Sequence, residues 1–440
     1  MTAAAASVSQ SNTVYKATLA RAVPRDTLGV MWKTVSTDCN LACDYCYYTA
    51  GGGRPEPLKH RIDRVLLEKT IREYMQQSDG AVGFAWQGGE PLLAGLHFFK
   101  EVVALQASCA LPNTLIGNAL QTNGTLLDED WARFFREFNF LIGVSVDGPK
   151  EIHDEHRVAG TGKGTFDLVM RKIGHLRRHH VDFNILTVLH EGNVHRAGDL
   201  MAFYAREGFD YVQFIPGMRF QAREPHTPAR YRITADQYGR FLCETFDIWY
   251  NDGAPRMSVR MFDDMLSIHA GHEAGSCNHR RTCSRTLVLE QNGDAYPCDF
   301  YMGPDWRLGT MATDPLPVIM ESPAYRKFLQ LKERLPEQCR CCEYLKFCNG
   351  GCPRNRTWND DGRPARPHFF CGAYRRLFDH AHERFASLAR KLRTNWLRDY
   401  ARTGARWPER NAPCICGSGR KFKRCCGPLR EELMALGQCR

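Results

Sequence analysis

The chain has 440 residues, of which 43% are hydrophobic, so it is long enough for two or three domains with sizeable cores. No stretch approaches the roughly 20 consecutive apolar residues that a transmembrane helix needs, which argues against a membrane span. From Ala373 onward there are 16 Lys and Arg against 6 Asp and Glu, which accounts for the whole net charge of +10. Residues 1–372 carry no net charge, which argues against a protein that binds nucleic acid electrostatically. The basic tail, residues 373–440, suits acidic partners.

The first 27 residues are mostly small and polar, and no apolar block of the signal-peptide kind occurs among them. We therefore expect a flexible leader, residues 1–27, on a cytoplasmic protein. The chain contains 19 cysteines, most of them in tight clusters. Such clusters would suggest disulfides in a secreted protein, but in a long cytosolic chain they more often bind metal. The cysteine pattern therefore predicts metal centres.

Residues 28–232 alternate short apolar segments with amphipathic runs such as 61–77 and 195–207. The six apolar segments are 30–35, 82–86, 116–120, 141–146, 183–189 and 211–215. Strands that alternate with helices form a parallel sheet with right-handed crossovers. Six units are two short of a complete eight-unit barrel, so the pattern predicts an α/β fold with a partial (β/α)6 barrel that is open on one side. In such folds the ligand lies at the carboxyl ends of the strands.

The segment STDCNLACDYCYY follows the first of these strands and spaces Cys39, Cys43 and Cys46 as C-x3-C-x2-C. A structural zinc site needs four ligands. Three thiolates can hold three irons of a [4Fe–4S] cluster and leave the fourth iron free to bind a small molecule. Chance cysteines in a loop, or part of a zinc site, are the alternatives. The segment resembles the radical S-adenosylmethionine (SAM) superfamily, which implies that SAM chelates the free iron and that reduction of the cluster releases a 5′-deoxyadenosyl radical.

Three further segments at strand ends carry the same resemblance: WQGGEPLL (86–93), QTNGTLL (121–127) and SVDGPKEIHDEHR (145–157). The resemblance implies SAM contacts from Tyr45, Gln87, Gly88, Gly89, Glu90, Ser145, Arg157 and Met218. The backbone of the GGEP element would hold the methionyl amino group, since glycines let main-chain atoms approach a ligand closely. Taken alone, GGEP is also compatible with a plain turn.

Within this set, Tyr45 and Met218 would lie against the adenine of SAM. Ser145 would contact the ribose or the carboxylate, and Arg157 the carboxylate, which the fork of an arginine side chain suits. A surface salt bridge is the alternative role for Arg157, and a core position is the alternative for Met218.

Two helices are expected near 234–250 and 256–270, after which the character of the sequence changes. Residues 277–372 contain nine cysteines and few long helices. Within this region Asn292-Gly293 indicates the turn of a hairpin, and 322–335 is expected to form a helix.

The cysteine spacing of this region resembles the SPASM extension of radical SAM enzymes, which binds two auxiliary [4Fe–4S] clusters. The resemblance implies that Cys277, Cys283, Cys298 and Cys352 hold the first auxiliary cluster, and that Cys339, Cys342, Cys348 and Cys371 hold the second. Four protein ligands leave no open iron, which suits electron transfer. Cys341 is an extra thiol that could take the place of Cys342. A pair of zinc sites is the alternative, because eight thiolates would serve either metal.

Asp299 follows Cys298 in the segment YPCDF. A carboxylate beside a cluster ligand is oddly placed for structure alone, because the iron–sulfur–thiolate core is negatively charged. With the segments above, it resembles the anaerobic sulfatase-maturating enzymes, and this resemblance spans about residues 28–372. In that family an aspartate here is the proposed general base, which removes the proton from the substrate's cysteine thiol or serine hydroxyl. The alternative for Asp299 is an exposed turn residue.

Beyond a basic amphipathic helix, the chain continues into PCICGSGRKFKRCCG, with the spacing C-x-C-x8-C-C. Cys414, Cys416, Cys425 and Cys426 can form one tetrahedral zinc site. The segment resembles the SEC-C motif. A module this small usually needs a bound metal or a similar cross-link to be stable. Its cationic side chains suit an acidic chaperone or a ribosome, and a stability cap without a partner is the alternative.

Together these resemblances imply a radical SAM oxidoreductase that oxidises an active-site cysteine or serine of an unfolded sulfatase to Cα-formylglycine. Its cofactors would be three [4Fe–4S] clusters, SAM and one Zn²⁺. An electron donor such as flavodoxin or ferredoxin would be a partner. The rival enzyme is a SPASM maturase that crosslinks or otherwise modifies another ribosomally made peptide. The rival of another class is a zinc-rich adaptor or nucleic-acid-binding protein.

The expected fold is thus a partial (β/α)6 radical SAM barrel, then a cysteine-rich SPASM domain, then a small zinc-binding module. The expected boundaries are a leader (1–27), the barrel (28–232), a helical connector (233–276), the SPASM domain (277–372), a basic helix (373–404) and the SEC-C module (405–440).

Overall fold

The computed structural model describes residues 28–48, 61–77, 80–218 and 233–437, so the expected leader lies outside the described residues. The chain divides into two compact units. The barrel unit contains Arg25–Ile233 and Thr282–Glu333, and the helical unit contains Thr234–Arg281 and Arg334–Arg440. The second part of the barrel unit therefore comes from the region expected to form the SPASM domain.

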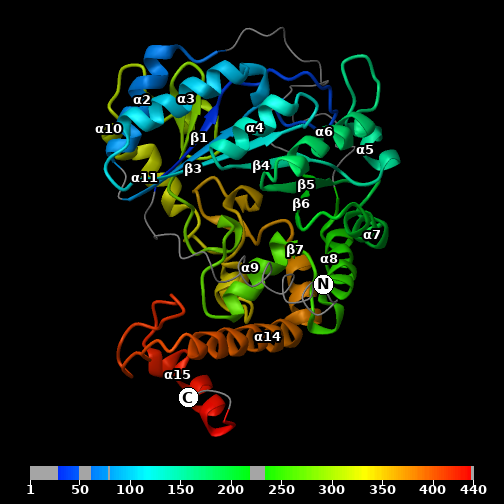
Figure 1. The fold of residues 1–440 in the computed structure, drawn as a ribbon, viewed down its shortest axis with the longest axis vertical. Helices are drawn as coiled ribbons and strands as arrows, with labels where there is room; N and C mark the ends of the chain where they lie inside the picture. The colour runs from blue at the N-terminus through cyan, green and yellow to red at the C-terminus, as the bar shows by residue number, and fades with distance from the viewer. Residues whose placement is uncertain (1–27, 49–60, 78–79, 219–232, 438–440) are drawn as a thin grey trace. The chain divides into compact units, whose positions relative to one another are not determined.

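Parallel strands form the first part of the barrel unit (Figure 1). They are β1 (Gly29–Lys33), β2 (Ala81–Gln87), β3 (Leu115–Thr122), β4 (Phe140–Ser145), β5 (Phe183–Leu189) and β6 (Tyr211–Pro216), paired in that order. The helices between them are α2 (Arg64–Gln76), α3 (Leu96–Cys109), α4 (Glu129–Glu137), α5 (Lys150–His156), α6 (Phe166–Arg178) and α7 (Ala197–Glu207). The predicted α/β partial barrel is confirmed.

Alternating side chains on β2 show which face of the sheet packs against the helices. The ring of Trp86 lies 5.5 Å from that of Phe99 on α3, and the ring of Phe84 lies 5.1 Å from that of Tyr74 on α2. Gln87 therefore points to the opposite face, inside the barrel. The register pairs it with Lys33 at the end of β1, so two polar side chains stand together at the carboxyl ends of adjacent strands.

The second part of the barrel unit extends the sheet beyond β1. Strands β8 (Thr286–Glu290) and β9 (Asp294–Tyr296) form an antiparallel hairpin whose turn contains Gly293 at φ +89°, as Asn292-Gly293 predicts. Strand β8 pairs in parallel with β1, and β10 (Gly309–Thr310) pairs with β9. Sequence analysis did not predict the β1–β8 pairing, which brings the segment after β9 to the barrel.

Two short helices, α10 (Leu316–Met320) and α11 (Pro323–Gln330), complete the barrel unit. The helix expected over 322–335 is therefore present but ends earlier, at Gln330.

The helical unit is built around α14 (Cys371–Arg402), which packs against α8 (Ala235–Tyr250) and α9 (Arg260–His269). The ring of Phe385 on α14 lies 4.6 Å from that of Phe246 on α8. The expected long helices are confirmed. The shorter elements are β7 (Ser258–Val259), α12 (Glu337–Arg340), α13 (Leu345–Cys348), β11 (Thr357–Trp358), β12 (Pro364–Arg366) and α15 (Gly427–Ala435). None of the helices in the described ranges has the length and apolar character of a membrane span.

Candidate active site and metal centres

The GGEP turn after β2 lies directly against the loop that carries the first three cysteines. The Gly89 N–H donates to the Ser36 carbonyl over 2.9 Å, and the Glu90 N–H donates to the Asp38 carbonyl over 2.7 Å. A Cβ atom on Gly89 would come within 1.8 Å of the Asp38 carbonyl oxygen. Glycine is needed here because two backbone segments touch, which is a reason that the sequence alone did not reveal.

The Glu90 carboxylate is fully buried and joins this turn to the segment after β3. It accepts hydrogen bonds from the Leu92 N–H over 3.0 Å and from the Asn123 N–H over 2.7 Å. The Thr122 hydroxyl donates to it over 2.8 Å. Burial raises the pKa of Glu90 to about 7. The Glu90 side chain therefore accepts its hydrogen bonds from donors within the chain.

A Glu90→Gln substitution is expected to remove part of the pH dependence of stability. The folded protein holds the Glu90 proton up to about pH 7, whereas the unfolded chain releases it near 4.5. Because the folded state binds more protons in this window, the contribution of Glu90 to the free energy of unfolding falls as the pH rises from 4.5 to 7. Chemical denaturation at several pH values should show that the free energy of unfolding falls less steeply between pH 4.5 and 7 for the variant than for the wild type. Equal pH dependence in the two proteins would contradict this role of Glu90.

The segment after β3 also contacts the cysteine loop. Asn123 Nδ2 donates to Asn40 Oδ1 over 2.9 Å and to Cys39 Sγ over 3.7 Å. The Leu41 N–H donates to the same sulfur over 3.4 Å. Hydrogen bonds to cluster sulfurs help set the reduction potential. Sequence analysis gave Asn123 no role of its own, although it lies in the QTNG motif.

Two thiols of the cysteine loop are held in surroundings that oppose their ionisation. Burial raises the pKa of Cys39 to about 12 and that of Cys43 to about 11, so gathering the thiolates requires a cationic centre among them. Within the described residues, these two thiols and Cys46 do not form a group whose ligand atoms lie within 4.8 Å of one another.

At the end of β4, Asp147 holds two of the expected SAM-contact residues together. It is fully buried and accepts hydrogen bonds from the Tyr45 hydroxyl and, over 2.9 Å, from Arg157 Nε. The Arg157 guanidinium lies 5.5 Å from the centre of the Tyr45 ring. Burial opposes ionisation, but the charge of Arg157 holds the pKa of Asp147 below its usual range. Sequence analysis assigned Tyr45 and Arg157 but missed Asp147, although it lies in the VDG motif.

The other expected SAM contacts also stand at strand ends. Gln87, Gly88 and Gly89 follow one another from the end of β2. Ser145 on β4 accepts a hydrogen bond from Gln121 Nε2 over 3.0 Å. Met218 is half-buried just beyond β6.

Asp299 joins the polar pair at the ends of β1 and β2. It forms an ion pair with Lys33, whose side chain is 1% exposed, and accepts hydrogen bonds from the hydroxyls of Tyr47 and Tyr48, the latter over 3.0 Å. Gln87 Nε2 donates to the Tyr48 hydroxyl over 3.2 Å and lies 3.5 Å from the Asp299 carboxylate. Asp299 is therefore the centre of a buried network and not an exposed turn residue.

This network surrounds one carboxylate with donors. Burial lowers the pKa of Lys33, while the charge of Asp299 acts in the opposite direction. Burial raises the pKa values of Tyr47 and Tyr48 well above the usual range, so both remain hydroxyl donors. Sequence analysis singled out Asp299 and Gln87 but missed the other three. The signal for Lys33 was a charge inside the apolar strand VMWKTV.

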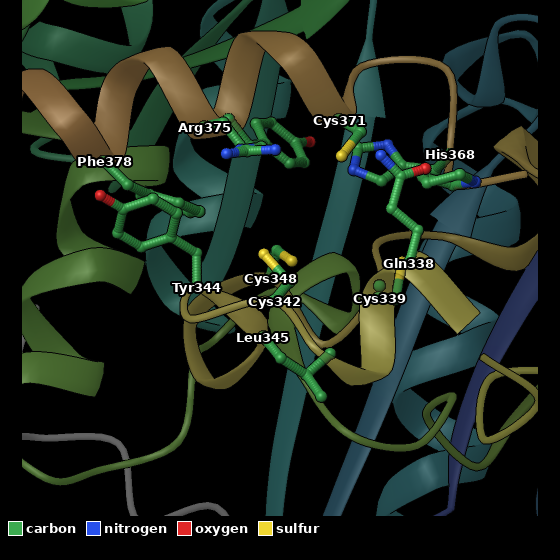
Figure 2. A pocket seen from close by; sticks show the side chains of 13 residues that line it. Gln338, Cys339, Cys342, Tyr344, Leu345, Cys348, His368, Cys371, Arg375 and Phe378 are labelled. Carbon is green, nitrogen blue, oxygen red and sulfur yellow. The ribbon is translucent and has the colours of Figure 1, made fainter. Parts of the chain in front are cut away.

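In the helical unit, Cys339, Cys342, Cys348 and Cys371 line one pocket, shown in Figure 2. Cys371 is the first residue of α14, and the others lie on and between α12 and α13. Burial raises the pKa of Cys348 to about 11. Cys341 is exposed and is not among the residues that line the pocket. The structure therefore brings together the set expected for the second auxiliary cluster, with Cys342 and not Cys341.

Two neighbouring cysteines provide a matched test of this pocket. Cys342→Ala is expected to lower the iron content of the anaerobically reconstituted protein by up to about four atoms per chain, because a four-iron cluster loses one of its four ligands. Cys341→Ala should keep the wild-type iron content. If instead Cys341→Ala lost iron and Cys342→Ala kept it, Cys341 would be the cluster ligand in place of Cys342.

The cysteines expected to hold the first auxiliary cluster are divided between the two units. Cys277 and Cys352 belong to the helical unit, and Cys283 and Cys298 belong to the barrel unit. This ligand set stays a prediction.

In the last part of the helical unit, four thiols lie close enough to bind one metal ion. The ligand atoms of Cys414, Cys416, Cys425 and Cys426 lie within 4.8 Å of one another. Cys416 Sγ is 3.5 Å from the sulfur of Cys414 and 3.5 Å from that of Cys425. Four sulfurs at about 2.3 Å from a tetrahedral zinc ion are separated by about 3.8 Å, so the donor set fits zinc.

Three family models match the chain. The Radical SAM superfamily model matches residues 34–204, the SPASM iron–sulfur cluster-binding domain model matches 277–343, and the SEC-C motif model matches 410–428. The first match contains the cysteine loop and the GGEP turn, and the last contains the four-thiol site.

Relatives extend the similarity over most of the chain. A cysteine-type anaerobic sulfatase-maturating enzyme of Clostridium perfringens (strain 13 / Type A) is 34% identical over 369 residues, which cover 83% of this chain and 99% of the relative. A serine-type anaerobic sulfatase-maturating enzyme of Bacteroides thetaiotaomicron is 37% identical over 370 residues, with coverages of 80% and 89%. The solved structure of native anSMEcpe with bound AdoMet and Cp18Cys peptide matches with a TM-score of 0.76 at 34% identity, covering 83% of this chain and 99% of that one. The chain therefore belongs to the anaerobic sulfatase-maturating enzyme family of the radical SAM superfamily.

Proposed function

We propose that this chain oxidises an active-site cysteine or serine of an unfolded sulfatase to Cα-formylglycine. The buried network around Asp299 carries this proposal, because it holds a carboxylate at the carboxyl edge of the barrel. Two of its donors, Tyr47 and Tyr48, directly follow the cluster cysteine Cys46. Cysteine-type and serine-type relatives match at similar identity, so the proposal covers both substrate residues.

The cofactors have defined places in this proposal. Cys39, Cys43 and Cys46 would hold the cluster that binds SAM. SAM would contact Tyr45, Gln87, Gly88, Gly89, Glu90, Ser145, Arg157 and Met218, at Glu90 through the backbone. Cys339, Cys342, Cys348 and Cys371 would hold one auxiliary cluster, and Cys277, Cys283, Cys298 and Cys352 the other. When bound, SAM and the first cluster supply the radical that removes a hydrogen atom from the substrate β-carbon.

The chain itself supplies the proton transfer. Asp299 accepts the proton of the substrate thiol or hydroxyl as a general base. Lys33 holds the carboxylate in place, and Tyr48 and Gln87 fix its orientation. After loss of a hydrogen atom, a proton and one electron, a serine becomes the aldehyde directly. A cysteine becomes a thioaldehyde, which water converts to the aldehyde with release of hydrogen sulfide.

The remaining electron has to leave the substrate. The cysteine pocket of the helical unit suits an electron acceptor, because its four thiolates leave no open iron. A flavodoxin or ferredoxin is the proposed reductant for the first cluster.

We further propose one Zn²⁺ at Cys414, Cys416, Cys425 and Cys426, and a cytoplasmic location. All described cysteines are free thiols, which suits a reducing compartment. An acidic chaperone or a ribosome is the proposed partner of the basic tail.

An anaerobic peptide assay tests the proposed reaction. The purified protein would be mixed with SAM, dithionite and a sulfatase-signature peptide, in matched cysteine and serine versions. The cysteine peptide should exchange its sulfur for oxygen and lose two hydrogens, and the serine peptide should lose two hydrogens. Deoxyadenosine formation with both peptides unmodified would count against sulfatase maturation and favour another peptide substrate.

A further inference from the structure

The loop of residues 270–276 joins α9 to Cys277 within the helical unit. Cys277 is an expected ligand of the first auxiliary cluster, and the zinc module (residues 405–437) follows α14 in the same unit. The contacts of this loop connect the two.

The zinc module packs firmly on the end of α14. Leu397 of α14 is fully buried in one core with Phe422, Leu429 and Leu433 of the module. Arg393 Nη2 on α14 donates to the Cys425 carbonyl over 2.9 Å, and an ion pair joins Arg390 to Glu432. This packing makes the module part of the helical unit.

Gly271 of the loop meets the zinc module. Gly271 has φ +89°, and a Cβ atom there would lie 1.7 Å from Nη2 of Arg420. The same Nη2 donates to Cys425 Sγ over 3.4 Å.

The other end of the same loop is tied to the cysteine-bearing segments. Asp264 on α9 is 3% exposed, and its Oδ1 accepts the N–H groups of Gly275 over 2.7 Å and of Ser276 over 3.2 Å. Arg280 Nε donates to the Ala274 carbonyl over 2.7 Å. The loop is therefore held on both sides.

We propose that the zinc module clamps the 270–276 loop and thereby holds the segment that leads into Cys277. The proposal rests on the proposed zinc site and not on the proposed reaction. It also gives the tail a role that needs no external partner.

Hydrogen exchange tests the clamp itself. Removing zinc from the wild-type protein should increase amide exchange in residues 270–281 as well as in 405–437. Arg420→Ala, which removes the contact with Gly271, should increase exchange in 270–276 while keeping zinc bound. Increased exchange confined to 405–437 would show an independent appendage and overturn the clamp. Neither measurement depends on peptide oxidation, so failure of the proposed reaction would be recognised separately.

Discussion

Replacing Asp299 by asparagine is expected to lower the rate of peptide oxidation by about 10²–10⁴-fold, the usual contribution of a positioned general base. Asparagine has the same shape but cannot take up the substrate proton. It also leaves the buried Lys33 without its counter-charge. The cleavage of SAM does not require this proton transfer, so deoxyadenosine should still form. Separation of the two rates is the signature of a base that acts on the substrate.

The measurement follows both products in the same anaerobic reaction, the aldehyde peptide by mass spectrometry and deoxyadenosine by chromatography. Asp305→Asn is the matched control, because Asp305 is exposed in the same segment after β9. The iron content of both variants should equal that of the wild type, which shows that the neighbouring Cys298 is undisturbed. Undiminished aldehyde formation by Asp299→Asn would remove Asp299 from the reaction.

The second large effect is expected from replacing Cys39, Cys43 and Cys46 together by alanine. The reconstituted protein should lose about four irons, because the cluster has no other protein ligands. Deoxyadenosine and aldehyde should both fall below detection. The cysteine pocket of the helical unit contains none of the three residues, so the iron bound there should remain.

The control for this variant is Cys109→Ala, a half-buried thiol at the end of α3. It should keep the iron content and both products of the wild type. Deoxyadenosine formation by the triple variant would contradict the assignment of the three cysteines.

The local features of the fold could be read from the sequence because they depend on neighbouring residues. The periodicity of apolar residues located β1 to β6 and the long helices to within a few residues. The Asn292-Gly293 turn predicted the β8–β9 hairpin. The parallel pairing of β8 with β1 was missed because no local pattern specifies which distant strand completes a sheet edge.

In the candidate site, too, some residues could be predicted from local sequence, whereas others depend on contacts between distant segments. The family resemblance carried by the cysteine spacing implied the loop residues and the pocket set that includes Cys342. The partners of Asp299 were missed because their burial and pairing arise only when the β1–β8 pairing brings the segment after β9 to the barrel. Lys33 is the clearest case, since a lysine in an apolar strand has no assignable role until its carboxylate partner is known.

The most direct test of the central claim uses a sulfatase-signature peptide with deuterium on the β-carbon of its target cysteine or serine. Radical abstraction at that carbon should place deuterium in the deoxyadenosine product and leave an aldehyde on the peptide. Transfer of the label together with aldehyde formation is the expected result. Deoxyadenosine without label, or a labelled product beside a peptide that contains no aldehyde, would contradict sulfatase maturation by this chain.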